Sequence, residues 1–126
     1  MDELIAFYGS LRRGHGLLDR LGVADKLEYL GPCKIPGQLY DLGEYPGLKE
    51  TPEGEVDAEC YRITDRAAFT VLDAYEDFRP AEPAASLFVR RKVRLIQPPI
   101  ECWVYYYPGP VLPQDRVLSG RWKTEA

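Results

Sequence analysis

The sequence predicts one α+β domain that is rich in strands and has one principal helix. Three observations support this class. With 126 residues, the chain is long enough for one hydrophobic core. Short apolar segments of strand length recur along it, separated by glycine and proline. One longer segment, residues 66–77, consists of good helix formers without glycine or proline. No repeat or linker divides the sequence, so we expect residues 1–126 to form a single domain.

The N-terminal half predicts strands that are interrupted by turns. Leu4 to Tyr8 is a short apolar strand that ends at Gly9, and residues 17–21 fit a helical turn that Gly22 closes. Between residues 26 and 48, strand-sized pieces alternate with glycine and proline. This pattern is typical of a bent antiparallel sheet or a barrel.

The C-terminal half predicts the helix between strands. Residues 53–63 form a strand that places Val56, Ala58, Cys60 and in part Arg62 on one face. The helix follows a cap at Thr64 or Asp65, and Pro80 stops it. Two long strands come next, over residues 85–96 and 100–107, and then a tail with a short final element over residues 116–122.

The charge of the chain argues against two classes of partner. A formal net charge of -4 and an isoelectric point near 5.0 disfavour nucleic acid and anionic membranes, because both require a concentrated positive surface. The densest basic run extends from Arg90 to Arg94, but Val93 interrupts it at strand spacing. We therefore interpret the run as the polar side of a strand and not as a phosphate-binding patch.

The cysteines indicate a reducing environment. Cys33, Cys60 and Cys102 are odd in number and far apart, so they suggest neither a disulfide framework nor a metal site. Each lies in an apolar context where a thiol behaves as a small buried hydrophobe. No segment has the length of a membrane span, and the acidic N-terminus is unlike a signal peptide. We expect a cytoplasmic protein.

The sequence Tyr-Gly-Ser-Leu, residues 8–11, is the first candidate site. A strand that breaks at Gly9 exposes successive backbone N–H groups, which can hold a carboxylate or an oxyanion, and Ser10 adds a hydroxyl. An ordinary turn from a strand to a loop fits the same residues. A phosphate loop does not, because His15 and Gly16 stand where that loop requires lysine and serine or threonine.

The principal helix carries the second candidate site. Helical spacing places Glu76 beside Phe69 and Leu72, whereas Asp73 and Asp77 fall nearer the polar side. An apolar setting would raise the pKa of Glu76 and suit it for proton transfer near neutral pH. A carboxylate at the helix end that faces solvent, or that pairs with Arg79, fits the same spacing, so spacing alone leaves both interpretations open.

Other residues that could carry chemistry give weaker signals. His15 is the single histidine and has no serine and acid partners at a recognisable spacing, and no cluster suggests zinc. In the last strand Trp103, Tyr105 and Tyr107 share one face, and Tyr106 points to the other. Most such stripes belong to a core, but we assign Tyr105 as a candidate whose hydroxyl lines a pocket.

Six segments together resemble one known family. In order they are FYGSLRRG from Phe7, GQLYDLGEYPGL from Gly37, GEV and CYRI from Gly54, LDAYED from Leu72, FVRRKVRL from Phe88, and CWVYYY from Cys102. In this order and spacing they are similar to the gamma-glutamylcyclotransferase-like superfamily, which includes avirulence-induced-gene-like proteins and gamma-glutamylamine cyclotransferases. The resemblance covers residues 7–107.

The resemblance implies a fold, a site and a reaction. The fold is a small mixed β-barrel with flanking helices and a cavity beside the glycine turn. Glu76 matches the family's general acid/base, and Tyr8, Gly9, Ser10 and Leu11 match its substrate-binding loop. The α-amine of a gamma-glutamyl amine or amino acid would attack its own side-chain carbonyl, giving 5-oxoproline and a free amine. This reaction requires no metal and no cofactor.

Some residues depart from the family pattern. Gly16 and Leu17 stand where many relatives carry an asparagine, Asp77 replaces a glycine after the acid, and Phe88 replaces a tyrosine. Asp77 would raise the pKa of Glu76 further if it lay close. A non-catalytic binding protein with the same cavity is therefore an alternative. A third hypothesis, hydrolysis by Asp73 and Glu76 as paired carboxylates, conflicts with the helical angle between them. The leaving amine, and the choice between monomer and homodimer, stay open.

Overall fold

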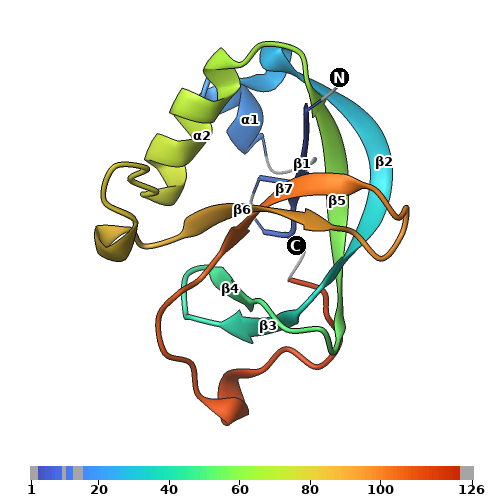
Figure 1. The fold of residues 1–126 in the computed structure, drawn as a ribbon, viewed down its shortest axis with the longest axis vertical. Coiled ribbons are helices and arrows are strands. Elements are labelled where there is room, and N and C mark those ends of the chain that lie inside the picture. The colour runs from blue at the N-terminus through green and yellow to red at the C-terminus, as the bar shows by residue number, and fades with distance from the viewer. Residues whose placement is uncertain (1–2, 10, 13–15, 123–126) are drawn as a thin grey trace.

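One twisted sheet organises the chain in the computed structural model, which describes residues 3–9, 11–12 and 16–122 (Figure 1). Within these residues the sheet has five strands in the order β2-β5-β1-β7-β6. Their bounds are β1 (Glu3–Phe7), β2 (Leu27–Pro36), β5 (Glu55–Ile63), β6 (Val89–Arg94) and β7 (Glu101–Tyr106). β1 pairs with β7 in parallel, and the other neighbours are antiparallel. The predicted mixed α+β class is confirmed.

The expected barrel is wrong, because the sheet does not close. β2 and β6 are its two edges. Among the described residues, β2 pairs with the segment that follows β6 at one isolated bridge, between Lys34 and Gln97. A separate hairpin, β3 (Gln38–Asp41) and β4 (Pro46–Lys49), lies across one end of the sheet (Figure 1). Alternating strands and turns predict how many strands form, but they do not predict whether the edge strands pair.

The helices cover one face of the sheet. α2 (Ala67–Glu76) lies beside α1 (Leu17–Arg20) in Figure 1. Asp65, one of the two predicted caps, accepts a hydrogen bond from the N–H of Ala67 (2.9 Å). The helix ends because Asp77 adopts a left-handed backbone conformation (φ 55°), three residues before Pro80. Short 3-10 turns occupy Ala24–Lys26, Pro83–Ala85 and Pro113–Asp115.

Two apolar clusters lie on the two faces of the sheet. The cluster under α2 contains Ile5, Phe7, Phe69, Leu72, Phe88 and Tyr105, with Trp103 and Tyr107 packed against it. The opposite cluster contains Tyr106 and all three cysteines, Cys33, Cys60 and Cys102, which are buried free thiols. The predicted alternation of residues 103–107 and the predicted burial of the cysteines are both confirmed.

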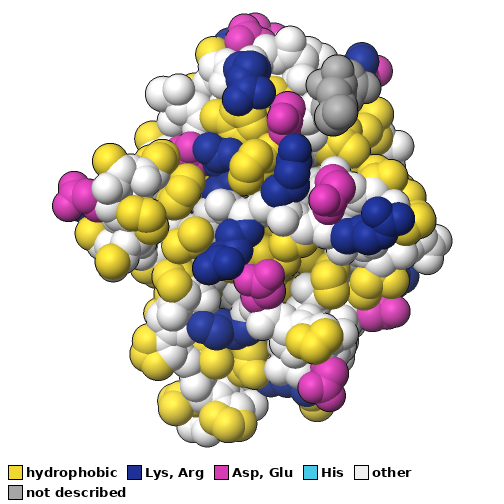
Figure 2. Space-filling view, viewed as in Figure 1, with side chains coloured by type: hydrophobic (Ala, Val, Ile, Leu, Met, Phe, Trp, Pro, Cys, Tyr) yellow, Lys and Arg dark blue, Asp and Glu magenta, His cyan; other side chains and the backbone are white. Residues whose placement is uncertain are grey.

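The charged strand β6 is neutralised by its neighbours. Figure 2 shows basic and acidic side chains interspersed over the visible surface. Arg91 pairs with Glu50 (3.7 Å) and Lys92 pairs with Glu3 (3.4 Å). The basic run therefore lies in a strand, as predicted, and Arg91 and Lys92 pair with carboxylates. Across residues 3–9, 11–12 and 16–122, no helix is long and apolar enough to cross a membrane.

Candidate active site

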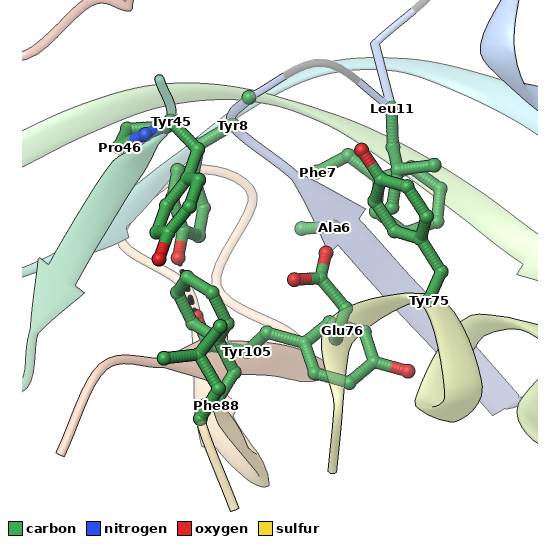
Figure 3. A pocket seen from close by; sticks show the side chains of 12 residues that line it. Ala6, Phe7, Tyr8, Leu11, Tyr45, Pro46, Tyr75, Glu76, Phe88 and Tyr105 are labelled. Carbon is green, nitrogen blue, oxygen red and sulfur yellow. Dashed lines mark hydrogen bonds between the residues drawn. The ribbon is translucent and has the colours of Figure 1, made fainter. Parts of the chain in front are cut away.

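A cavity of about 200 Å³ opens where β1 ends, between α2 and the β3–β4 hairpin (Figure 3). Its lining comes from the end of β1, the following turn, the loop before β4 and its first residue, the end of α2, the segment before β6, and β7. The lining residues are Ala6, Phe7, Tyr8, Gly9, Leu11, Tyr45, Pro46, Tyr75, Glu76, Leu87, Phe88 and Tyr105. The described members of the predicted site therefore meet at one cavity; Ser10 lies outside the described residues.

Glu76 supplies a carboxyl group in an apolar setting. It is the last residue of α2, it is partly buried, and Figure 3 shows its carboxyl group directed into the cavity toward Ala6. It makes no hydrogen bond or ion pair with any residue that the structure describes. Burial, and secondarily the charge of Asp73, raise the pKa of Glu76 to about 8. The alternative pairing with Arg79 is absent, because Arg79 pairs with Asp77 (3.3 Å).

Asp73 does not face solvent as expected. Its side chain is buried, and its carboxylate accepts hydrogen bonds from Arg90 Nε (2.8 Å), Arg90 Nη2 (3.0 Å) and the Tyr105 hydroxyl (2.6 Å). The guanidinium of Arg90 lies over the rings of Phe69 (4.2 Å) and Trp103 (4.6 Å). These contacts occupy the Asp73 carboxylate, so it is not available as a second reacting group beside Glu76.

The two tyrosines predicted for the site present their rings to the cavity, and their hydroxyls bond to the protein. The hydroxyl of Tyr105 donates to Asp73. The pKa of Tyr105 is raised, first by burial and then by this hydrogen bond. The hydroxyl of Tyr8 donates to the backbone carbonyl of Tyr105 (2.7 Å). Burial, and then the charge of Glu76, also raise the pKa of Tyr8. Both hydroxyls therefore stay protonated and fix the cavity wall.

The glycine turn is held in place by Arg12. The N–H and the Nε of Arg12 both donate to the carbonyl of Gly9 (3.1 and 3.0 Å), and Nη2 donates to the carbonyl of Trp122 (3.1 Å). A Cβ atom on Gly9 would lie 3.0 Å from the Pro46 ring, so glycine permits this close approach. Sequence reasoning missed this role of Arg12, although Arg12 lies in the first of the six family segments.

The departures from the family pattern have local consequences. Gly16 adopts a left-handed conformation (φ 73°) just before α1, which begins at Leu17. The neighbouring charge that raises the pKa of Glu76 is Asp73 and not Asp77, so the condition set for an effect of Asp77 is not met. Phe88 forms an apolar wall of the cavity and contacts Tyr45 edge-on, with ring centroids 5.8 Å apart.

Sequence reasoning also missed further residues that line the cavity. Tyr45, Pro46, Tyr75 and Leu87 line it, yet they were not assigned to the site. Tyr45 and Pro46 lie in the second family segment, and Tyr75 precedes Glu76. The sequence therefore shows the segments that contain Tyr45, Pro46 and Tyr75, but it does not show that these residues meet at one cavity. Among the described residues, no group of three or more histidine, cysteine, aspartate or glutamate side chains is arranged to hold a metal ion.

Comparison with known proteins assigns the chain to one protein family. The profile of the family described as gamma-glutamyl cyclotransferase, AIG2-like, matches residues 5–124. The gamma-glutamylcyclotransferase family protein YtfP of Escherichia coli K12 is 38% identical over 120 residues, which covers 94% of each chain.

Solved structures show the same fold. The solution structure of Escherichia coli ytfP has a TM-score of 0.66 and 30% identity, and the match covers 94% of this chain and 95% of that chain. The crystal structure of an AIG2-like protein from mouse has a TM-score of 0.72 and 20% identity, and the match covers 99% of this chain and 90% of that chain.

Proposed function

Since this chain belongs to the gamma-glutamyl cyclotransferase, AIG2-like family, we propose that it converts a gamma-glutamyl amine or amino acid to 5-oxoproline and a free amine. Glu76 is the general acid/base in this proposal. Tyr8, Gly9, Ser10, Leu11 and Tyr105 form the substrate-binding surface. The reaction uses a small-molecule substrate and no metal or cofactor.

The observation that carries the proposal is the isolated carboxyl group of Glu76. The α-ammonium group of a gamma-glutamyl compound has a pKa above the value of about 8 found for a peptide amino terminus, because its own α-carboxylate lies beside it, whereas an ordinary glutamate has a pKa of about 4.3 and is a poor base toward it. The apolar cavity raises the pKa of Glu76 to about 8 and so removes most of this mismatch. Proton transfer between groups of similar pKa is efficient near neutral pH.

The proposed reaction begins when ionised Glu76 takes a proton from the substrate's α-ammonium group. The freed amine attacks the gamma-carbonyl carbon, and the carbonyl oxygen becomes an oxyanion. Glu76 then gives a proton to the leaving nitrogen as the carbon–nitrogen bond breaks. Of the three ammonium protons, one stays on the ring nitrogen of 5-oxoproline and two end on the released amine, so a single carboxyl group serves each transfer.

The glycine turn supplies the remaining contacts in this proposal. Its backbone N–H groups would hold either the substrate's α-carboxylate or the oxyanion. Arg12 supports this role, because its hydrogen bonds to the Gly9 carbonyl fix the turn before substrate binds. A fixed turn lowers the cost of folding the substrate into the geometry in which amine and carbonyl meet.

The size of the cavity supports a small reacting group. Its volume of about 200 Å³ is below the usual range of roughly 300–1,000 Å³ for sites that bury a drug-sized ligand. In this proposal the gamma-glutamyl group occupies the interior next to Glu76, and the leaving amine projects toward the opening.

The test is release of 5-oxoproline from a panel of gamma-glutamyl amines and amino acids. Wild type, Glu76→Gln and the surface control Glu53→Gln are compared. We expect Glu76→Gln to lose at least about 100-fold in kcat on the best substrate, because it can no longer move protons. Glu53 is exposed and outside the cavity, so Glu53→Gln should keep full activity.

Two results would contradict the proposal. Unchanged kcat in folded Glu76→Gln would exclude Glu76 as the acid/base. No release from any panel member would remove the enzymatic function; if 5-oxoproline still raised the melting temperature, the non-catalytic binding protein would become the better description.

A further inference from the structure

The opening of the cavity is unusually apolar. Seven large hydrophobic side chains are exposed among the described residues, and three of them line this one cavity: Tyr45, Tyr75 and Leu87. They come from the loop before β4, from α2 and from the segment before β6. Single exposed hydrophobic side chains are common, but convergence of several around one opening marks a binding surface.

Part of this apolar rim is held by packing behind it. The ring of Tyr45 meets Phe88 edge-on, and Phe88 in turn contacts Tyr107, each with ring centroids 5.8 Å apart. Figure 3 shows Tyr45 and Tyr75 on opposite sides of Glu76. A ligand group that leaves the interior of the cavity therefore passes between aromatic side chains.

The described lining contains no cation that would meet a carboxylate at this opening. Its one charged side chain is Glu76. Two cations of the described residues have other partners: Arg90 binds Asp73, and Lys49 donates to the carbonyls of Tyr107 (2.9 Å) and Gly109 (2.7 Å). Tyrosine hydroxyls are the side-chain donors that the described rim offers to a carboxylate, and without a cation the loss of hydration there is unfavourable.

We propose that the rim formed by Tyr45, Tyr75 and Leu87 selects gamma-glutamyl amides whose leaving amine carries an aromatic or branched alkyl group and no charge. This inference rests on the proposed function, because it takes the gamma-glutamyl group to lie beside Glu76. It separates two substrate classes that the family resemblance leaves together. Amides of apolar amines are favoured, and gamma-glutamyl amino acids are disfavoured by their second carboxylate.

The experiment compares substrates that differ by one group. Gamma-glutamyl-2-phenylethylamide and gamma-glutamyl-phenylalanine share every atom of the ring and linker, and the second adds a carboxylate. We expect kcat/KM to be at least tenfold higher for the phenylethylamide. Gamma-glutamyl-ethanolamide, which is uncharged but polar, should fall below the phenylethylamide because it cannot cover the rim side chains.

A pair of variants tests whether the rim itself is responsible. Leu87→Lys places a cation at the opening. It should reduce the ratio of kcat/KM values, phenylethylamide over gamma-glutamyl-phenylalanine, at least fivefold, because kcat/KM for gamma-glutamyl-phenylalanine rises. Leu118→Lys is the matched control, because Leu118 is 82% exposed and does not line the cavity. It should leave the preference as in wild type.

Each outcome decides between the two proposals. Release of 5-oxoproline with equal or reversed preference within the substrate pair would overturn this inference and leave the proposed function standing. The same holds if Leu87→Lys and Leu118→Lys give the same preference as wild type. No release from any compound would overturn the proposed function and this inference with it.

Discussion

Two carboxyl groups on one helix have opposite surroundings. Asp73 and Glu76 lie less than one turn apart on α2, and both are withdrawn from solvent. Asp73 accepts three hydrogen bonds from Arg90 and Tyr105, whereas Glu76 contacts an apolar cavity without a polar partner among the described residues. The helix is the same in both cases, so the difference comes from the strands that face it.

The sheet supplies partners at one position and space at the other. β6 and β7 bring Arg90 and Tyr105 to Asp73. Glu76 is the final helical residue and faces the point where β1 gives way to the glycine turn. A buried carboxylate with charged partners holds a structure together, and a buried carboxyl group without partners is poised to exchange a proton.

The largest effect should come from exchanging these carboxyl groups for amides. Asp73→Asn removes the anionic partner of the partly buried Arg90 and should lower the free energy of unfolding by about 3 kcal/mol. Glu76→Gln removes no partner and should not destabilise the protein. Urea unfolding of both variants at pH 7 measures the difference. Equal losses in the two variants would contradict the contrast between the sites.

The same variants give a pH dependence with a defined sign. The folded-state pKa of Glu76 is raised from 4.5 to about 8, so the folded protein keeps a proton that the unfolded chain releases. Wild type should therefore lose stability as the pH rises from 4.5 to 8, by on the order of 4 kcal/mol. Glu76→Gln lacks this loss: it should match wild type near pH 4.5 and exceed it at pH 8. Parallel stability curves would contradict the raised pKa.

A smaller effect is expected from Tyr105→Phe. The change deletes the hydroxyl that donates to Asp73 and should cost about 1–2 kcal/mol of stability. Because the hydroxyl points to Asp73, turnover in the folded variant should change by less than about threefold, well below the roughly tenfold cost of a lost hydrogen bond worth 1.4 kcal/mol. Measured kcat and KM values of the folded variant check this. A tenfold rise in KM with unchanged stability would instead place the hydroxyl against substrate.

Much of the local structure could be predicted from the sequence. Helix formers located α2, although Asp77 and not Pro80 ends it, and alternation along residues 103–107 assigned the two faces of β7 correctly. The spacing of Glu76 beside Phe69 and Leu72 correctly indicated an apolar setting. These patterns act within one element, and neighbouring residues along the chain are enough to set them.

Features that depend on distant residues could not be predicted. The helical angle predicts Asp73 near solvent, because it carries no information about Arg90, which belongs to β6. The barrel was expected because strand patterns do not reveal that β2 and β6 remain edges. The apolar rim joins residues 45, 75 and 87, whose proximity exists only in the folded chain.

The central claim is that the cavity converts Glu76 into a proton-transfer group, and its direct test is the titration of that carboxyl group. Carbon-13 NMR of protein with labelled glutamate side chains follows the carboxyl carbons against pH, and Glu76→Gln assigns the Glu76 signal. The account predicts a pKa of about 8, so that the group is mostly protonated at pH 7. A pKa near the ordinary value of about 4.3 would contradict it.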